Sequence, residues 1–109
     1  MTINITLLSR RGDQHSIEAN EDISLMENFR DAGIDEMLAL CGGSCSCATC
    51  HVYIEEKFYD RVLEASPMSI DENELLDGSL HRGETSRLSC QIKAEPFMEG
   101  MLVRLAPED

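Results

Sequence analysis

Apolar and polar residues alternate at the start of the chain. The first positions read Thr2-Ile3-Asn4-Ile5-Thr6-Leu7, and residues 14–20 follow after a turn that contains Gly12-Asp13. Alternation with a period of two is typical of a strand that buries one face. We therefore expect strands at residues 2–8 and 14–20. The same alternation differs from a secretory signal peptide, which has a basic flank followed by an apolar core.

A helix is predicted directly after this hairpin. The stretch from Ser24 to Glu27 is a capping box, with Ser at the N-cap and Glu three positions later. Leu25, Phe29 and Ala32 then fall on one helical face, and Gly33 provides a stop signal.

Two further segments have helical features. Ser69-Ile70-Asp71-Glu72 is a second capping box, and it predicts a short acidic helix that ends before Gly78. The stretch from Phe58 to Leu63 is ambiguous, and we interpret it as one helical turn.

The remaining apolar stretches predict strands. These are residues 51–54, residues 86–92 and residues 101–105, and a short buried run is expected at residues 37–40. Several strands combined with a helix after the first hairpin indicate the α+β class. At 109 residues the chain has the length of one domain, 1–109, with a modest core.

Four cysteines have the spacing of a metal-binding cage. Cys41, Cys47 and Cys50 follow the pattern C-x5-C-x2-C, and Cys90 lies far downstream. A [2Fe-2S] cluster needs four deprotonated cysteines, two for each iron. Cys45 is then a surplus thiol, and we interpret it as a small side chain beside the cluster. The alternatives for Cys45 are alternative ligation of the cluster or a redox role.

Other uses of these cysteines fit less well. The plant-type ferredoxin spacing C-x4-C-x2-C would need a cysteine at position 42, which is Gly42. A zinc ribbon needs two C-x2-C knuckles, and only Cys47 to Cys50 forms one. A disulfide framework is typical of small secreted chains with an even number of cysteines, whereas this chain has five.

The residues around the cysteines also fit an anionic cluster. A backbone that wraps around an anion needs small residues, and Gly42, Gly43 and Ser44 are of this kind. His51 follows Cys50 directly. It is either a Rieske-type iron ligand or a structural histidine that hydrogen-bonds beside the loop, and the four cysteines favour the second interpretation.

The net charge of the chain excludes some classes of binding partner. Twenty-one acidic residues against nine basic ones give a formal net charge of −12. Nucleic acids and anionic membranes need a basic face, so we expect neither as a partner. No apolar run is long enough for a transmembrane helix. Reduced thiolates without an export signal predict a cytoplasmic location.

These motifs resemble a known family, the [2Fe-2S] ferredoxins of the putidaredoxin and adrenodoxin type. The resemblance covers essentially the whole chain, including the Ser24-Leu25-Met26 opening of the first helix. It is most specific in Cys41-Gly42-Gly43-Ser44, Ser46-Cys47-Ala48-Thr49-Cys50-His51-Val52-Tyr53 and Ser86-Arg87-Leu88-Ser89-Cys90-Gln91-Ile92.

Several expectations follow from the resemblance. It implies a β-grasp fold, in which a mixed sheet carries one main helix and short helices, with the cluster loop at one edge. It implies one [2Fe-2S] cluster held by Cys41, Cys47, Cys50 and Cys90, and a carrier of single electrons rather than an enzyme. Its partners would be an FAD-containing, NAD(P)H-dependent reductase and a terminal oxygenase, with the carrier a monomer.

The resemblance leaves the electron acceptor open. Some relatives that serve cytochrome P450 have an acid before the first ligand and a C-terminal Trp, whereas this chain has Leu40 and ends at Asp109 without any Trp. Relatives of similar motif serve Rieske-type dioxygenases in aromatic hydrocarbon catabolism. Relatives with an extra cysteine at the place of Cys45 supply cluster assembly. A module in which zinc or a cluster is only structural is a further alternative.

The short acidic helix predicted after Ser69 is a candidate docking surface. Acidic residues in the adrenodoxin-like family face the partner from this helix, and the resemblance transfers that role to Asp71, Glu72, Glu74 and Asp77. At helical spacing Asp71, Glu74 and Asp77 share one side. The alternative is a solvated helix face whose acids interact with the helix dipole.

Overall fold

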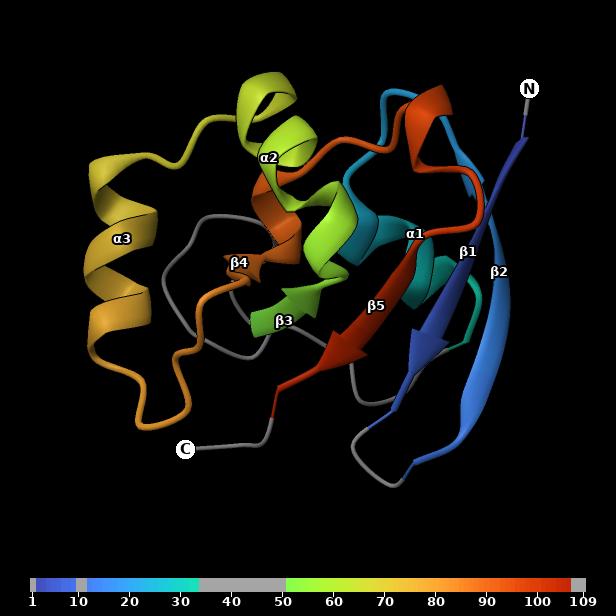
Figure 1. Ribbon diagram of the computed structural model, residues 1–109. Coiled ribbons are helices and arrows are strands. Elements are labelled where there is room, and N and C mark those ends of the chain that lie inside the picture. The colour runs from blue at the N-terminus through green and yellow to red at the C-terminus, as the bar shows by residue number, and fades with distance from the viewer. Residues whose placement is uncertain (1, 10–11, 34–50, 107–109) are drawn as a thin grey trace.

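The computed structural model describes residues 2–9, 12–33 and 51–106, and its centre is a mixed five-stranded sheet (Figure 1). The strand order is β2-β1-β5-β3-β4. The strands are β1 (Thr2–Leu8), β2 (Gln14–Asn20), β3 (His51–Ile54), β4 (Ser86–Leu88) and β5 (Leu102–Leu105). β1 pairs antiparallel with β2 and parallel with β5, while β3 pairs antiparallel with both β5 and β4.

The alternating residues at the start of the chain form two strands that each bury one face, as predicted. In β1 the side chains of Ile3, Ile5 and Leu7 are buried, and Ile17 and Ala19 are buried in β2. Alternate side chains of a strand point to opposite faces, so these residues line the inner face of the sheet. The predicted bounds of both strands agree with the structure.

The first helix, α1 (Leu25–Asp31), covers that inner face. Ser24 is its N-cap, and the hydroxyl of Ser24 accepts a hydrogen bond from the Glu27 amide at 3.1 Å, as the capping box predicted. Gly33 follows the helix with a φ of +85°, a conformation that favours glycine. The predicted apolar face needs one correction, because Ala32 is exposed and Met26 is buried beside Phe29.

Two further helices lie between β3 and β4 in the sequence. α2 (Glu56–Ala65) is longer than the single turn expected from Phe58 to Leu63, and it buries Val62. α3 (Ile70–Asp77) ends before Gly78 as predicted, and the hydroxyl of its N-cap Ser69 accepts a hydrogen bond from the Glu72 amide. α3 lies beside β4 at the edge of the sheet (Figure 1).

The segment after β4 differs from the prediction. A strand was expected at residues 86–92, but β4 ends at Leu88 and a 3₁₀ turn, η2 (Ser89–Gln91), follows. The last described pair of the β3–β4 ladder joins His51 to Leu88. After Leu88 the backbone forms the 3₁₀ turn instead of continuing as a strand. A second 3₁₀ turn, η3 (Pro96–Met98), precedes β5. Among the described residues, no helix combines the length and apolar character needed to cross a bilayer.

One buried polar side chain connects β2 to α1. The Asn28 side chain accepts a hydrogen bond from the Asn20 amide at 2.8 Å and donates to the carbonyl oxygens of Asn20, Ile23 and Ser24. It is 4% exposed, so water cannot replace these partners. Asn28 therefore holds the turn between β2 and α1.

We expect Asn28→Ala to lower the free energy of unfolding by about 1–3 kcal/mol, because buried backbone groups lose their partners. Urea unfolding followed by circular dichroism measures this change. The control is Asn4→Ala, since Asn4 is exposed and a surface change of this kind alters stability by about 0.5 kcal/mol or less. Equal effects of the two substitutions would contradict the structural role of Asn28.

Candidate metal centre

Cys90 lies in the 3₁₀ turn η2, and its side chain is partly buried. This turn is held against α1, because the Leu25 amide of α1 donates to the carbonyl oxygen of Ile92, the residue after the turn, at 2.8 Å. Cys90 is the one predicted cluster ligand among the described residues. Cys41, Cys47 and Cys50, and the surplus Cys45, lie outside the described residues.

The two elements that flank residues 34–50 both contact the part of the chain that carries Cys90. On one side, α1 packs against η2. On the other side, β3 begins at His51, which pairs with Leu88 two residues before Cys90. Cys50 is joined to His51 by a peptide bond, and neighbouring Cα atoms are about 3.8 Å apart. A cage of thiolates from Cys90 and residues 34–50 is therefore compatible with this framework.

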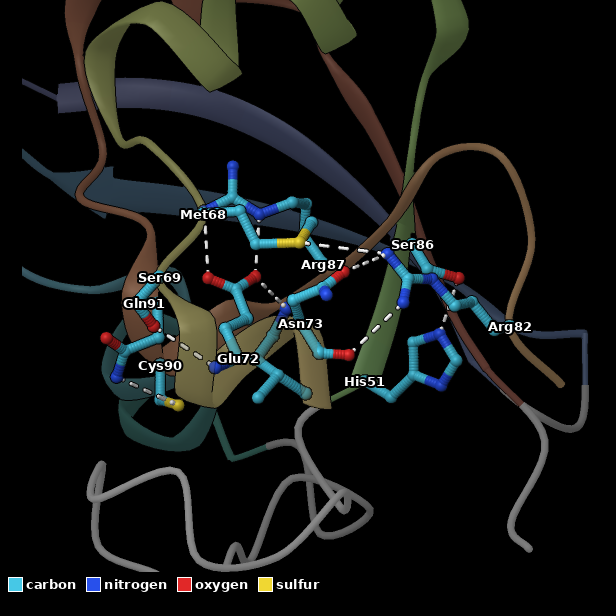
Figure 2. Close-up of polar contacts among 11 residues, drawn as sticks. His51, Met68, Ser69, Glu72, Asn73, Arg82, Ser86, Arg87, Cys90 and Gln91 are labelled. Carbon is cyan, nitrogen blue, oxygen red and sulfur yellow. Dashed lines mark hydrogen bonds and ion pairs between the residues drawn. The ribbon is translucent and has the colours of Figure 1, made fainter. Parts of the chain in front are cut away.

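Next to this centre lies a fully buried ion pair (Figure 2). Arg87 Nε and Nη2 donate to the two carboxylate oxygens of Glu72 at 2.6 and 3.1 Å. The Leu88 amide donates to the same carboxylate at 3.0 Å. Both side chains are 0% exposed, and Arg87 Nη1 has no hydrogen-bond partner in the part of the chain that the structure describes. The pair fastens α3 to β4 three residues before Cys90.

This ion pair corrects one of the docking residues. Glu72 was expected to face a partner, but its carboxylate is enclosed between α3 and β4 and cannot reach a docked protein. Asp71 and Glu74 are exposed, as expected. The side chain of Asp77 is 66% exposed and forms an ion pair with Arg82, which partly compensates its charge.

Arg82 attaches the segment after α3 to the helix. Besides Asp77, it donates to the Asn73 carbonyl oxygen at 3.2 Å and to Asn73 Oδ1 at 2.9 Å. The contacts between Arg82 and Asn73 appear at the right of the buried pair in Figure 2. α3 is therefore fixed by Glu72 on its buried side and by Arg82 on its exposed side.

His51 has the structural role that the cysteine count favoured. It is 2% exposed, and its Nε2 lies 2.7 Å from Ser86 Oγ. Its Nδ1 lies 3.5 Å from Ser79 Oγ, and its ring contacts Tyr53 edge to face. Because hydroxyl groups face both ring nitrogens, the imidazole joins β3 to β4 and to the segment after α3.

Comparison with known proteins places the chain in a family. Residues 9–95 match the family described as the 2Fe-2S iron-sulfur cluster binding domain. The chain belongs to this family. Ferredoxin CarAc of Sphingomonas sp is 38% identical over 107 residues, covering 96% of this chain and 95% of that protein. Putidaredoxin of Pseudomonas putida is 36% identical over 99 residues and covers 91% of each chain.

Solved structures agree with this assignment. The ferredoxin of Rhodopseudomonas palustris HaA2 is similar with a TM-score of 0.84 and 38% identity, covering 96% of both chains. The ferredoxin chain of the covalent complex between putidaredoxin reductase and putidaredoxin gives a TM-score of 0.85 at 33% identity, covering 96% of this chain and 99% of that one. The predicted β-grasp fold, the putidaredoxin-type resemblance and the [2Fe-2S] cofactor are confirmed. The relatives are ferredoxins, which carry electrons and are not enzymes.

Sequence reasoning missed the ion pair and the two hydroxyl partners of His51, Ser86 and Ser79. The signal for the ion pair was weak, because Glu72 reads as part of a capping box and Arg87 lies in an expected strand. Long charged residues are seldom fully buried, so a buried Glu72–Arg87 pair could be recognised only from the fold.

We expect Glu72→Gln to destabilise the cluster-loaded protein by about 3–5 kcal/mol, because it leaves the buried Arg87 charge without a compensating carboxylate. Glu74→Gln on the same helix is the control, since Glu74 is exposed. Urea unfolding of both variants measures the difference. Two variants of equal stability would show that the buried pair does not hold α3.

Proposed function

We propose that this ferredoxin takes single electrons from an FAD-containing, NAD(P)H-dependent reductase and passes them to a terminal oxygenase. The proposal of a reductase partner rests on the likeness to putidaredoxin over almost the whole chain. Putidaredoxin has been seen in a covalent complex with putidaredoxin reductase. The acceptor is either a Rieske-type aromatic-ring dioxygenase or a cytochrome P450. Supply of electrons to cluster assembly, or a purely structural metal module, is the alternative.

Four thiolates are proposed to hold the cluster, from Cys41, Cys47, Cys50 and Cys90. The geometry that supports this set is the contact of both flanking elements, α1 and β3, with the chain around Cys90. When bound, the cluster accepts and releases one electron. The chain would supply the thiolates, a partly buried site at Cys90 and a hydrogen-bond donor, Gln91 Nε2, near the Cys90 sulfur.

The exposed acids of α3 are the proposed docking surface. Asp71, Glu74 and Asp77 remain in the set after Glu72 is removed, and the net charge of −12 adds to their effect. A basic face on the reductase or oxygenase would complement them and accelerate the encounter. Transient redox interfaces are small, about 1,200 Å² or less.

The wider setting is also a proposal. We propose that residues 1–109 work as a single ferredoxin domain, as a monomer in the cytoplasm, within aromatic hydrocarbon catabolism. Reconstitution with each acceptor class tests this setting. Product formation with a Rieske dioxygenase and none with a P450 would support it, and the reverse would assign the carrier to a P450 system.

Replacing each proposed ligand by Ser should remove or strongly destabilise the cluster, because metal binding and folding are coupled. Cys45→Ser is the matched control, and it should keep the visible spectrum, iron and sulfide of the wild type. Iron and sulfide analysis measures both. Loss of the cluster in Cys45→Ser, with retention in Cys47→Ser, would overturn the ligand assignment.

Reversing two docking charges in Asp71→Lys/Glu74→Lys should slow reduction by the reductase at low salt and leave the cluster spectrum unchanged. The control is Glu18→Lys/Glu21→Lys, which makes the same change of net charge at exposed positions in and after β2. Stopped-flow reduction at about 0.01 M and 0.5 M salt measures the effect, and high salt should reduce the difference because it shortens the Debye length. Equal rates in both double variants would show that α3 is not the docking surface.

A further inference from the structure

The side chain of Gln91 contacts the sulfur of Cys90. Gln91 Nε2 lies 3.5 Å from Cys90 Sγ, and Figure 2 shows the two side chains meeting in the turn that follows β4. The contact joins neighbouring residues, so it is formed within η2 and depends on the 3₁₀ conformation of that turn. In the strand that the sequence predicted, neighbouring side chains would point to opposite faces.

The backbone around Gln91 is fixed from both sides. On one side, the Leu88 amide is bound by the Glu72 carboxylate at 3.0 Å. On the other side, the Ile92 amide donates to the Ser89 carbonyl oxygen and the Ile92 carbonyl oxygen accepts from Leu25. The turn is therefore anchored to α3 and α1. Because these contacts fix the backbone of the turn, they also fix the position from which the side-chain amide of Gln91 reaches the Cys90 sulfur.

An amide donor at a thiolate changes the energy of its negative charge. Reduction adds one negative charge to the cluster, and part of that charge is carried by the sulfur ligands. A donor to sulfur stabilises the reduced form more than the oxidised form, so it raises the reduction potential. Gln91 is partly buried, so its donor is only partly in competition with water.

We propose that Gln91 is a positioning residue that donates a hydrogen bond to the ligand sulfur of Cys90 and thereby raises the reduction potential of the carrier. This inference rests on the proposed ligand role of Cys90. It assigns a function to a side chain next to the motif, and the function is to set the driving force for electron transfer.

The first test uses the wild-type protein. The chain contains two glutamines, Gln14 and Gln91. Glutamine labelled with ¹⁵N in its side-chain amide therefore reports on these two sites, and Gln14 lies in β2 at the opposite edge of the sheet. Pulsed EPR of the reduced cluster should show a ¹⁵N coupling that is retained in Gln14→Leu and lost in Gln91→Leu. Absence of the coupling in the labelled wild type would overturn the proposal.

The second test is the reduction potential. At an ambient potential equal to the wild-type midpoint, Gln91→Leu should show about a tenfold lower ratio of reduced to oxidised cluster, which corresponds to about 59 mV for one electron. Gln91→Glu should lower the ratio further, because it places a carboxylate near the thiolate. Gln14→Leu should match the wild type. Unchanged potentials in both Gln91 variants would overturn the proposal.

These outcomes are distinct from a failure of the proposed ligand set. A wild-type protein without the visible bands and EPR signal of a [2Fe-2S] cluster would refute the cofactor assignment itself. An intact cluster in Cys90→Ser with a wild-type spectrum would refute the ligand role of Cys90. An intact wild-type cluster with neither a ¹⁵N coupling nor a potential shift would refute only the role of Gln91.

Discussion

The antiparallel pairing of β3 with β4 is the constraint on which the metal centre depends. It sets His51 opposite Leu88, although the two residues lie far apart in the chain. The thiolates of a cluster must meet within bonding distance of two irons that share bridging sulfides, and a flexible loop alone would lose much entropy in reaching that arrangement. The ladder brings the residue after Cys50 and the residues before Cys90 together.

The buried Glu72–Arg87 pair extends this constraint to the surface. Glu72 binds the Leu88 amide as well as Arg87, so α3 and the segment that leads to Cys90 form one hydrogen-bonded unit. α3 therefore carries exposed acids on one side, and on its other side it is bonded to β4, the strand that precedes Cys90. Support of this kind around metal ligands orients them and tunes the metal. Acids on one helix therefore lie in two different environments, because Glu72 is buried and Asp71 and Glu74 are exposed.

Much of the fold could be predicted from local patterns, because alternation and capping boxes act through nearby residues. Both hairpin strands and the N-caps Ser24 and Ser69 agree with the structure. The length of α2 was underestimated, since its N-cap Glu55 makes no side-chain capping hydrogen bond and so gives no start signal. The turn at Cys90 and the burial of Glu72 depend on partners distant in sequence, and no local pattern encodes them. The cysteine spacing carried the ligand assignment, and three of those four residues lie outside the described residues.

A reductive titration of the purified wild-type protein, followed by visible absorbance and EPR, tests the central claim most directly. We predict a red-brown protein whose visible bands bleach with one electron per chain, with an EPR signal that integrates to one spin per chain. A colourless protein that contains zinc and takes up no electrons would contradict the account of this chain as a one-electron carrier.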